Sequence, residues 1–413
     1  KLYFGASGSS GFEPYVSDGT GPGTSLLKDI APGSSSPQNF KAVGNKVFFS
    51  ADADGSATGT GRELWITDGT SAGTSLVKDI NPNTFTYYGN TYAGFSNPQN
   101  LTACNDKLFF VAQNGVNGYE PWVSDGTAAG TMMLKDIYTG NNSLYGYGDS
   151  GNYTNSMTCV GTTLFFRAYD PSYGYGLYKS DGTTAGTTLV VDTARTVKPT
   201  DVSNLKAFAG KLYFSAYDST NGTELWVSDG TNAGTTLVKN IYPGVNSSSP
   251  SSFTEHLGKL YFSASDSRGN ELWSTDGTTV GTLFIKDINQ TAPGANSTPK
   301  NFYSWSGKLY FTADNGVIGR ELWSTDGTGT GTNLVKDIFP GVSDILDTSN
   351  YSENQPYFAG ITSGLIFTAN SPIYSQEMWV SDGSASGTRL LVDAKVGPGY
   401  SYARNAVAFN GKI

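Results

Sequence analysis

The 413-residue chain contains a single histidine, two cysteines and four methionines, and only 15% of its residues are charged. One histidine leaves little room for histidine-based catalysis, and the cysteines and histidine are too few to build a zinc cluster. No apolar run approaches the ~18 residues of a membrane-spanning helix, so the sequence predicts no membrane insertion. A formal net charge of -9 argues against nucleic acid and anionic membranes as partners.

The residues that are abundant favour strands and turns. The chain has 52 glycines and 25 tyrosines, and 13% of its residues are aromatic. The aromatic content argues against disorder, because such a chain has ample apolar surface to bury. Glycine, serine and threonine take the place of good helix formers, which indicates an all-β protein with many turns.

One unit is repeated eight times along the chain. Strand-like segments of the "KLYF" type begin at residues 1, 46, 107, 163, 211, 259, 308 and 364. Each is followed by an "ELWVSDGT"-type segment, whose Asp-Gly pair recurs at Asp18, Asp68, Asp125, Asp181, Asp229, Asp276, Asp326 and Asp382. A "LVKDI" segment and a short "NFKAVG" segment complete the unit. Four strands per repeat, eight times, predict a single eight-bladed β-propeller over residues 1–413.

The ends of the chain predict how the ring closes. The chain starts at the second strand of a repeat and stops after a first strand, residues 406–411. We expect this last strand to pair antiparallel with the three N-terminal strands, which would remove exposed sheet edges; an open array of the same units is the alternative. Residues 411–413 read as the start of another repeat, so we expect a longer polypeptide.

The repeat resembles a known family. Residues 63–74 spell "ELWxxDGTxxGT", and matching stretches begin at Glu224, Glu271 and Glu321. This motif resembles the ELWxxDGT-repeat family of large secreted or surface-attached proteins, and the resemblance covers the whole chain. It implies an extracellular location and a modular architecture, and it implies no defined activity. Tyr15 and Tyr178 replace the tryptophan in two repeats; we expect those blades to keep the fold, because tyrosine also fills a blade interface.

Residues that recur in every blade are expected to be structural. These are the Asp-Gly-Thr turns and the tryptophans at 65, 122, 226, 273, 323 and 379. The unique His256 is either packed at a blade interface or forms an acid–base pair with Glu255. Asp52 and Asp54, with Ser56 and Glu63, have spacings similar to a calcium loop. Calcium is therefore the one ion that the sequence suggests, and aspartates that merely favour turns are the alternative.

The two cysteines are predicted to meet. Cys104 and Cys159 lie on the first strands of consecutive repeats, at positions of opposite parity. Alternate positions of a strand face opposite sides, and neighbouring blades present opposite faces to each other. The two thiols are therefore expected across one blade interface, as a disulfide if the protein is secreted. Two independent core cysteines are the alternative.

Long tyrosine-rich inserts suggest a contact surface. They span 81–100, 138–156 and 339–357, and the first two join consecutive blades. Tyrosine mixed with asparagine, glycine and serine is typical of recognition loops. We predict a contact surface formed by Tyr87, Tyr88, Tyr92, Tyr145, Tyr147 and Tyr153. The alternative is that these rings pack on their own blades.

The function expected from the sequence is non-enzymatic. We expect a structural or adhesive extracellular module that contacts other extracellular proteins or copies of itself. A carbohydrate-binding propeller, or lectin, is the alternative. A glycoside hydrolase with paired carboxylates is the third hypothesis. In a secreted eukaryotic protein, candidate glycosylation sites would be Asn100, Asn141, Asn152, Asn221, Asn246, Asn289, Asn296 and Asn350.

Overall fold

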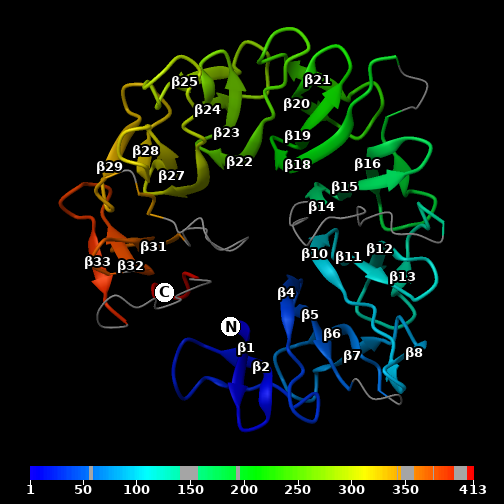
Figure 1. The fold of residues 1–413 in the computed structure, drawn as a ribbon. Coiled ribbons are helices and arrows are strands. Elements are labelled where there is room, and N and C mark those ends of the chain that lie inside the picture. The colour runs from blue at the N-terminus through cyan, green and yellow to red at the C-terminus, as the bar shows by residue number, and fades with distance from the viewer. Residues whose placement is uncertain are drawn as a thin grey trace. The chain divides into compact units, whose positions relative to one another are not determined.

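A computed structural model describes residues 1–54, 59–139, 157–191, 196–341, 343–345, 358–374, 376–394 and 407–413. In these ranges the strands form one three-stranded sheet, seven four-stranded sheets and one two-stranded hairpin (Figure 1). The chain is an all-β, eight-bladed β-propeller, as the eight repeats predict. No helix that could cross a membrane occurs among the described residues.

The chain divides into two compact units, residues 1–212 with 229–235, and residues 213–228 with 236–413. The first unit contains four complete sheets and the hairpin. Its strands are β1 (Leu2–Gly8), β2 (Gly11–Ser17), β3 (Ser25–Leu26), β4 (Gln38–Val43), β5 (Lys46–Asp52), β6 (Arg62–Thr67), β7 (Ser75–Lys78), β8 (Thr84–Tyr87), β9 (Asn90–Ala93), β10 (Gln99–Cys104), β11 (Lys107–Gln113), β12 (Tyr119–Ser124), β13 (Met132–Met133), β14 (Met157–Val160), β15 (Thr163–Asp170), β16 (Gly174–Ser180) and β17 (Thr188–Leu189).

The boundary between the units falls within the fifth sheet, and three further sheets lie in the second unit. The fifth sheet consists of β18 (Thr200–Phe208), β19 (Lys211–Asp218), β20 (Gly222–Ser228) and β21 (Thr236–Lys239). The remaining strands are β22 (Ser251–His256), β23 (Lys259–Asp266), β24 (Gly269–Thr275), β25 (Leu283–Lys286), β26 (Lys300–Trp305), β27 (Lys308–Asp314), β28 (Arg320–Thr325), β29 (Asn333–Lys336), β30 (Ala359–Ile361), β31 (Gly364–Asn370), β32 (Gln376–Ser381) and β33 (Arg389–Val392).

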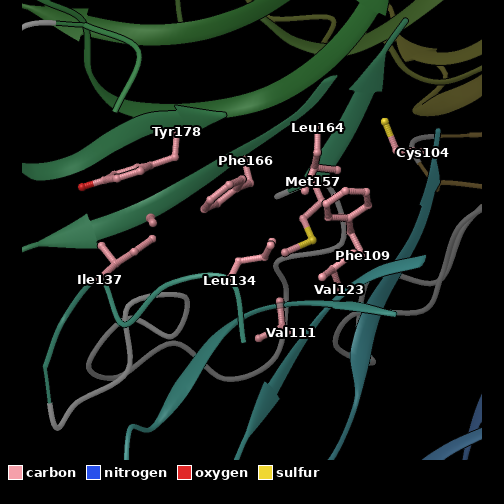
Figure 2. Packing of buried hydrophobic residues seen from close by; sticks show 11 residues of the cluster. Cys104, Phe109, Val111, Val123, Leu134, Ile137, Met157, Leu164, Phe166 and Tyr178 are labelled. Carbon is pink, nitrogen blue, oxygen red and sulfur yellow. The ribbon is translucent and has the colours of Figure 1, made fainter. Parts of the chain in front are cut away.

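The core of each unit lies between consecutive sheets. Between the third and fourth sheets, Phe109 of β11 packs in one cluster with Leu164 and Phe166 of β15. Figure 2 shows Leu134 and Ile137, which follow β13, on the side that faces Phe166 of β15 and Tyr178 of β16. The second strand of a blade is buried on both faces, which explains why its sequence is a continuous apolar run rather than an alternating one.

The repeated Asp-Gly-Thr turn is held by its own side chains. The Asp68 carboxylate accepts hydrogen bonds from the backbone amide of Thr70 at 2.9 Å and from its hydroxyl at 2.7 Å. The Thr70 hydroxyl in turn accepts the amide of Gly73 at 3.0 Å. Bonds to the threonine, with serine in the last repeat, lower the pKa of this aspartate in all eight turns. The carboxylate is therefore used inside the turn.

The closing strand predicted for residues 406–411 stays a prediction. Among the described residues the first sheet consists of β1, β2 and β3. Residues 395–406 lie outside the described part of the chain. Phe409 and Lys412, which follow them, form an isolated bridge with each other.

Candidate functional site

Part of the insert 81–100 is a β-hairpin, not an irregular loop. Strands β8 and β9 pair with Phe85 opposite Tyr92 and Tyr87 opposite Asn90. The two residues at the tip, Tyr88 and Gly89, both have positive φ, at 47° and 77°. Such a pair is typical of a type I′ hairpin turn, in which asparagine or aspartate is the usual first residue. A tyrosine with positive φ is a backbone outlier that persists at a local cost.

The rings of this aromatic hairpin, residues 84–95, are largely in solvent. Tyr88 is 86% exposed and Tyr87 is 59% exposed, with their ring centroids 4.4 Å apart. At the base, Phe85 stacks on Tyr92 at 5.6 Å and meets the edge of Phe95 at 5.8 Å. The base is thus a small aromatic cluster that supports the hairpin. The two tip tyrosines extend beyond the cluster.

The second insert is described only in part. Tyr145, Tyr147 and Tyr153 lie outside the described residues, so their place in a contact surface stays a prediction. Tyr138, at the start of that insert, packs on Tyr169 of β15 with ring centroids 5.4 Å apart. Tyr138 therefore packs on a blade, as the alternative prediction for the inserts states.

The third insert also begins against a blade. Phe339 packs against the buried cluster that contains Val335 and Phe367 in the seventh and eighth sheets. Tyr351 and Tyr357 lie outside the described residues. Of the predicted contact residues, Tyr87 and Tyr88 at the tip of the aromatic hairpin are the ones with a large described exposure.

The glutamate of the ELW motif is a buried hub in the blades that carry it. Glu271 is fully buried on β24. Its carboxylate accepts the backbone amide of Ile288 at 2.8 Å, the amide of Ser297 at 3.0 Å and the hydroxyl of Ser297 at 2.5 Å. The same donors recur at Glu13, Glu63 and Glu224. One carboxylate therefore ties the third strand to the residues just after the fourth strand and to the loop beyond them.

Burial perturbs the ionisation of these glutamates. Loss of solvation raises the pKa of Glu63 and of Glu271 to about 7, against the hydrogen bonds that oppose it. For Glu321 the same burial, with Asp337 and Asp344 nearby, raises the pKa to about 8. Because the hub recurs from blade to blade, we interpret these shifts as a result of folding and not as the sign of a catalytic acid.

The fourth repeat shows what replaces the hub. Gly176 stands where the other repeats have glutamate, opposite Ala168 on β15. A side chain at this position would meet the ring of Tyr173 at 2.7 Å. Tyr173 is buried, and its hydroxyl donates to the carbonyl of Pro199 at 3.2 Å. The tyrosine ring therefore occupies the space of the missing glutamate, and the departure from the motif is compensated.

The lysine of the "LVKDI" segment links one blade to the next. The Lys78 ammonium donates to the carbonyl of Thr131 at 2.8 Å, and that of Lys286 donates to the carbonyl of Thr332 at 2.6 Å. Equivalent bonds are made by Lys28, Lys135, Lys239 and Lys336. In every case the acceptor is the last threonine of the following "DGTxxGT" turn. The glutamate thus holds together the blades that carry it, and the lysine joins neighbouring blades.

The unique histidine is an interface residue. His256 is 3% exposed, and its Nδ1 lies 2.8 Å from the Ser304 hydroxyl on the neighbouring strand β26. Glu255 is exposed on the opposite side of β22, so the two do not form the acid–base pair considered from the sequence. The buried Nε2 has no hydrogen-bond partner among the described residues. Within the described part of the chain, no carboxylate bonds to the ring to orient it as in a catalytic histidine.

The described residues provide no third side-chain ligand for the calcium site expected at Asp52 and Asp54. Asp52 lies opposite Arg62 in the sheet. Burial lowers the pKa of Arg62, and the nearby Asp52 carboxylate acts in the opposite direction. The Asp54 carbonyl accepts the amide of Gly61 at 3.1 Å. Ser56 lies outside the described residues, and within them no three aspartate, glutamate, cysteine or histidine side chains gather as an ion site.

The two cysteines are joined in a disulfide. Cys104 on β10 and Cys159 on β14 have Cα atoms 5.5 Å apart, within the range of a native bridge. The bond links the first strands of the third and fourth sheets, as the alternation argument predicts.

The candidate glycosylation sites differ in access. Asn246 and Asn296 are exposed, whereas Asn289 is 7% exposed and its amide donates to the carbonyl of Asn296. The side-chain amide of Asn221 is bonded to Asp218, and Asn100 lies on the inner strand β10. Asn141, Asn152 and Asn350 lie outside the described residues.

No protein-family model and no curated protein matches this sequence. The chain is similar in structure to the computationally designed Ika8 protein, with 14% identity and a TM-score of 0.44, over 91% of this chain and 92% of that one. It is also similar to puromycin hydrolase, with 14% identity and a TM-score of 0.41, over 89% of this chain and 56% of that one. The β-propeller domain of the Trilobed protease from Pyrococcus furiosus shares 12% identity at a TM-score of 0.37, over 87% of this chain and 98% of that domain. Similarities at this level carry no information on function.

Proposed function

We propose that this chain is a non-enzymatic, extracellular adhesive module of the ELWxxDGT-repeat type, and that it contacts a protein partner through the tip of the aromatic hairpin. The observation that carries the proposal is the pair Tyr87 and Tyr88, which are 59% and 86% exposed. A rigid ring with a polar end loses little entropy when it binds, which makes exposed tyrosines effective contact residues.

The backbone of the hairpin supports a role in binding over one in packing. Tyr88 has a φ of 47° in a turn that asparagine would form at lower cost. Its ring meets Tyr87 and is otherwise largely in solvent, so folding gains little from it. A residue that strains the backbone and adds little packing energy is typical of a functional position. The extracellular location rests on the Cys104–Cys159 disulfide, which persists in oxidising compartments, and on the resemblance of the repeat.

The proposal is tested by binding of the fluorescently labelled chain to the cells that produce it. The double variant Tyr87→Ser, Tyr88→Ser is compared with Val280→Ser, which changes another highly exposed apolar residue, in the second unit. We expect the tyrosine variant to bind at least about tenfold more weakly, as hot-spot residues do, and the valine variant to bind normally.

Pretreatment of the cells identifies the kind of partner. Protease treatment should abolish binding if the partner is a protein, whereas periodate treatment should abolish it if the partner is a glycan. Binding that survives in the tyrosine variant, or that periodate alone removes, would contradict the proposal.

A further inference from the structure

A hollow lined by the first strands of four consecutive sheets lies within the first unit. It has a volume of about 680 Å³, which is within the usual ~300–1,000 Å³ of small-molecule sites. Strands β4, β10, β14 and β18 line it, and β10 and β14 are the strands that the Cys104–Cys159 disulfide joins. A covalent link between two walls restricts their relative movement, which favours a preformed site.

The hollow has the opposite charge to the molecule. The chain has a net charge of -9, yet the charged residues of the lining are Lys41 and Lys206, with no carboxylate among the described lining residues. Neither lysine makes a hydrogen bond or an ion pair with another described residue. Two ammonium groups that line one cavity with no described carboxylate partner would attract an anion.

These lysines are not a repeated feature of the blade. The corresponding position is Lys41, Thr102, Thr158 and Lys206 in the strands that line the hollow. In the four later repeats the sequence has threonine, tyrosine, alanine and valine there. A residue needed for the blade itself would recur in every blade. The two lysines therefore mark one asymmetric place in the molecule.

The neutral part of the lining matches a hydroxyl-rich ligand. Asn39 and Asn100 both have positive φ, at 59° and 54°, and lie within β-bulges that interrupt the register of β4 and β10. Bulges re-aim side chains at the edges of sites. The Asn39 amide donates to Ser50 Oγ and to the Pro98 carbonyl, both at 3.5 Å, and its oxygen can accept. The Thr102 and Thr158 hydroxyls donate to backbone carbonyls and add acceptors. Ala103 and Ala207, which are partly exposed, supply apolar surface between these groups.

We infer that the hollow binds an acidic saccharide of the hexuronate class, with its carboxylates on Lys41 and Lys206. The ring hydroxyls would bond to the asparagines and threonines, and the C–H faces would lie on the apolar residues. The described lining residues include no arginine and no helix N-terminus, the groups that most often hold a phosphate. This site is separate from the aromatic hairpin, and the inference goes beyond the adhesive function proposed above.

The test is calorimetric titration of the full chain with tetramers of galacturonate and of glucuronate. The fully methyl-esterified galacturonate tetramer is the matched neutral ligand. We expect a free uronate tetramer to bind, its ester to bind at least about tenfold more weakly, and Lys41→Met and Lys206→Met each to weaken uronate binding by a similar factor. Lys259→Met, which changes an exposed lysine outside the lining, should have no effect.

Three results would overturn the inference. They are an absence of binding to both uronate tetramers, binding that both lysine variants retain, and sulfate binding as tightly as the sugar, which would indicate an adventitious ion only. Unfolding temperatures of Lys41→Met and Lys206→Met equal to that of the parent show that the loss is local. Binding by the Tyr87→Ser, Tyr88→Ser variant should be unchanged, so failure of this site and failure of the hairpin are told apart.

Discussion

Ser96 donates two hydrogen bonds to the buried Glu63 carboxylate, from its amide at 2.8 Å and from its hydroxyl at 2.5 Å, across 33 positions of sequence. The relationship recurs between Glu271 and Ser297, 26 positions apart. In these blades it fastens the loop after the fourth strand onto the third strand. The stability of the blades should therefore depend on this carboxylate.

We expect Glu271→Ala to lower the free energy of unfolding by about 3 kcal/mol or more, because two amides and one hydroxyl lose their acceptor in a buried place. Ser297→Ala removes the hydroxyl alone and should cost about 1 kcal/mol. Urea unfolding measures both. Glu255→Ala, at an exposed position, is the control and should change little. A Glu271→Ala loss no larger than that of the control would show that water replaces the carboxylate.

Stability should fall as pH rises from about 6.5 to 9. The folded-state pKa of Glu63 and Glu271 is about 7 and that of Glu321 is about 8, all raised from 4.5 by burial. A raised carboxyl pKa adds stability that is complete below the unfolded pKa and is lost as pH rises through the folded pKa. The turn aspartates have lowered pKa values, so they change the stability only near pH 4 and below. The pKa of His256 is also lowered, so this residue changes the stability only below its ordinary pKa of 6.5.

The loss over this range should be on the order of 3 kcal/mol in total, and it is followed by the urea midpoint at each pH. Glu321→Gln, which cannot ionise, should flatten the pH profile even if it lowers stability at every pH. A stability that is level or rising between pH 6.5 and 9 would contradict the prediction.

Reduction of the disulfide should destabilise the protein by about 4 kcal/mol, the chain-entropy value for a bridge between residues 55 positions apart. The measurement is urea unfolding with and without a thiol reductant. The double variant Cys104→Ala, Cys159→Ala should start at the lower stability and show no response to reductant. Equal midpoints for the parent chain in both conditions would mean that the bridge does not form in solution.

The sequence predicts the repeated parts of this structure well, because the same pattern is observed eight times. The starts of the second strands, the Asp-Gly-Thr turns and the Cys104–Cys159 pairing follow from the repeat, turn chemistry and strand alternation. The glutamate hub was missed, although a signal was present: repeats with the glutamate also carry a serine in the loop before the next first strand, as at Ser96 and Ser297. A single sequence does not show that two such residues touch.

The candidate sites were harder to predict, because each depends on features that do not repeat. The hollow requires Lys41 of β4 and Lys206 of β18 to line one space, although they are 165 positions apart in the sequence. The aromatic hairpin was expected as a loop, since Tyr-Gly at its tip is a poor turn signal beside Asn-Gly. At the hairpin tip local propensity and the observed structure disagree, which is typical of residues kept for reasons other than folding.

That disagreement makes Tyr88 the sharpest test of the hairpin. Tyr88→Asn places asparagine at the first tip position, where its side chain tolerates the φ of 47° that the turn requires. We expect amide hydrogen exchange at Asn90 and Thr91 to slow or stay unchanged, while binding to producing cells falls as in the double serine variant. Asparagine would thus improve the turn and remove the contact. If exchange accelerates instead, the Tyr88 ring stabilises the hairpin, and the residue is there for packing.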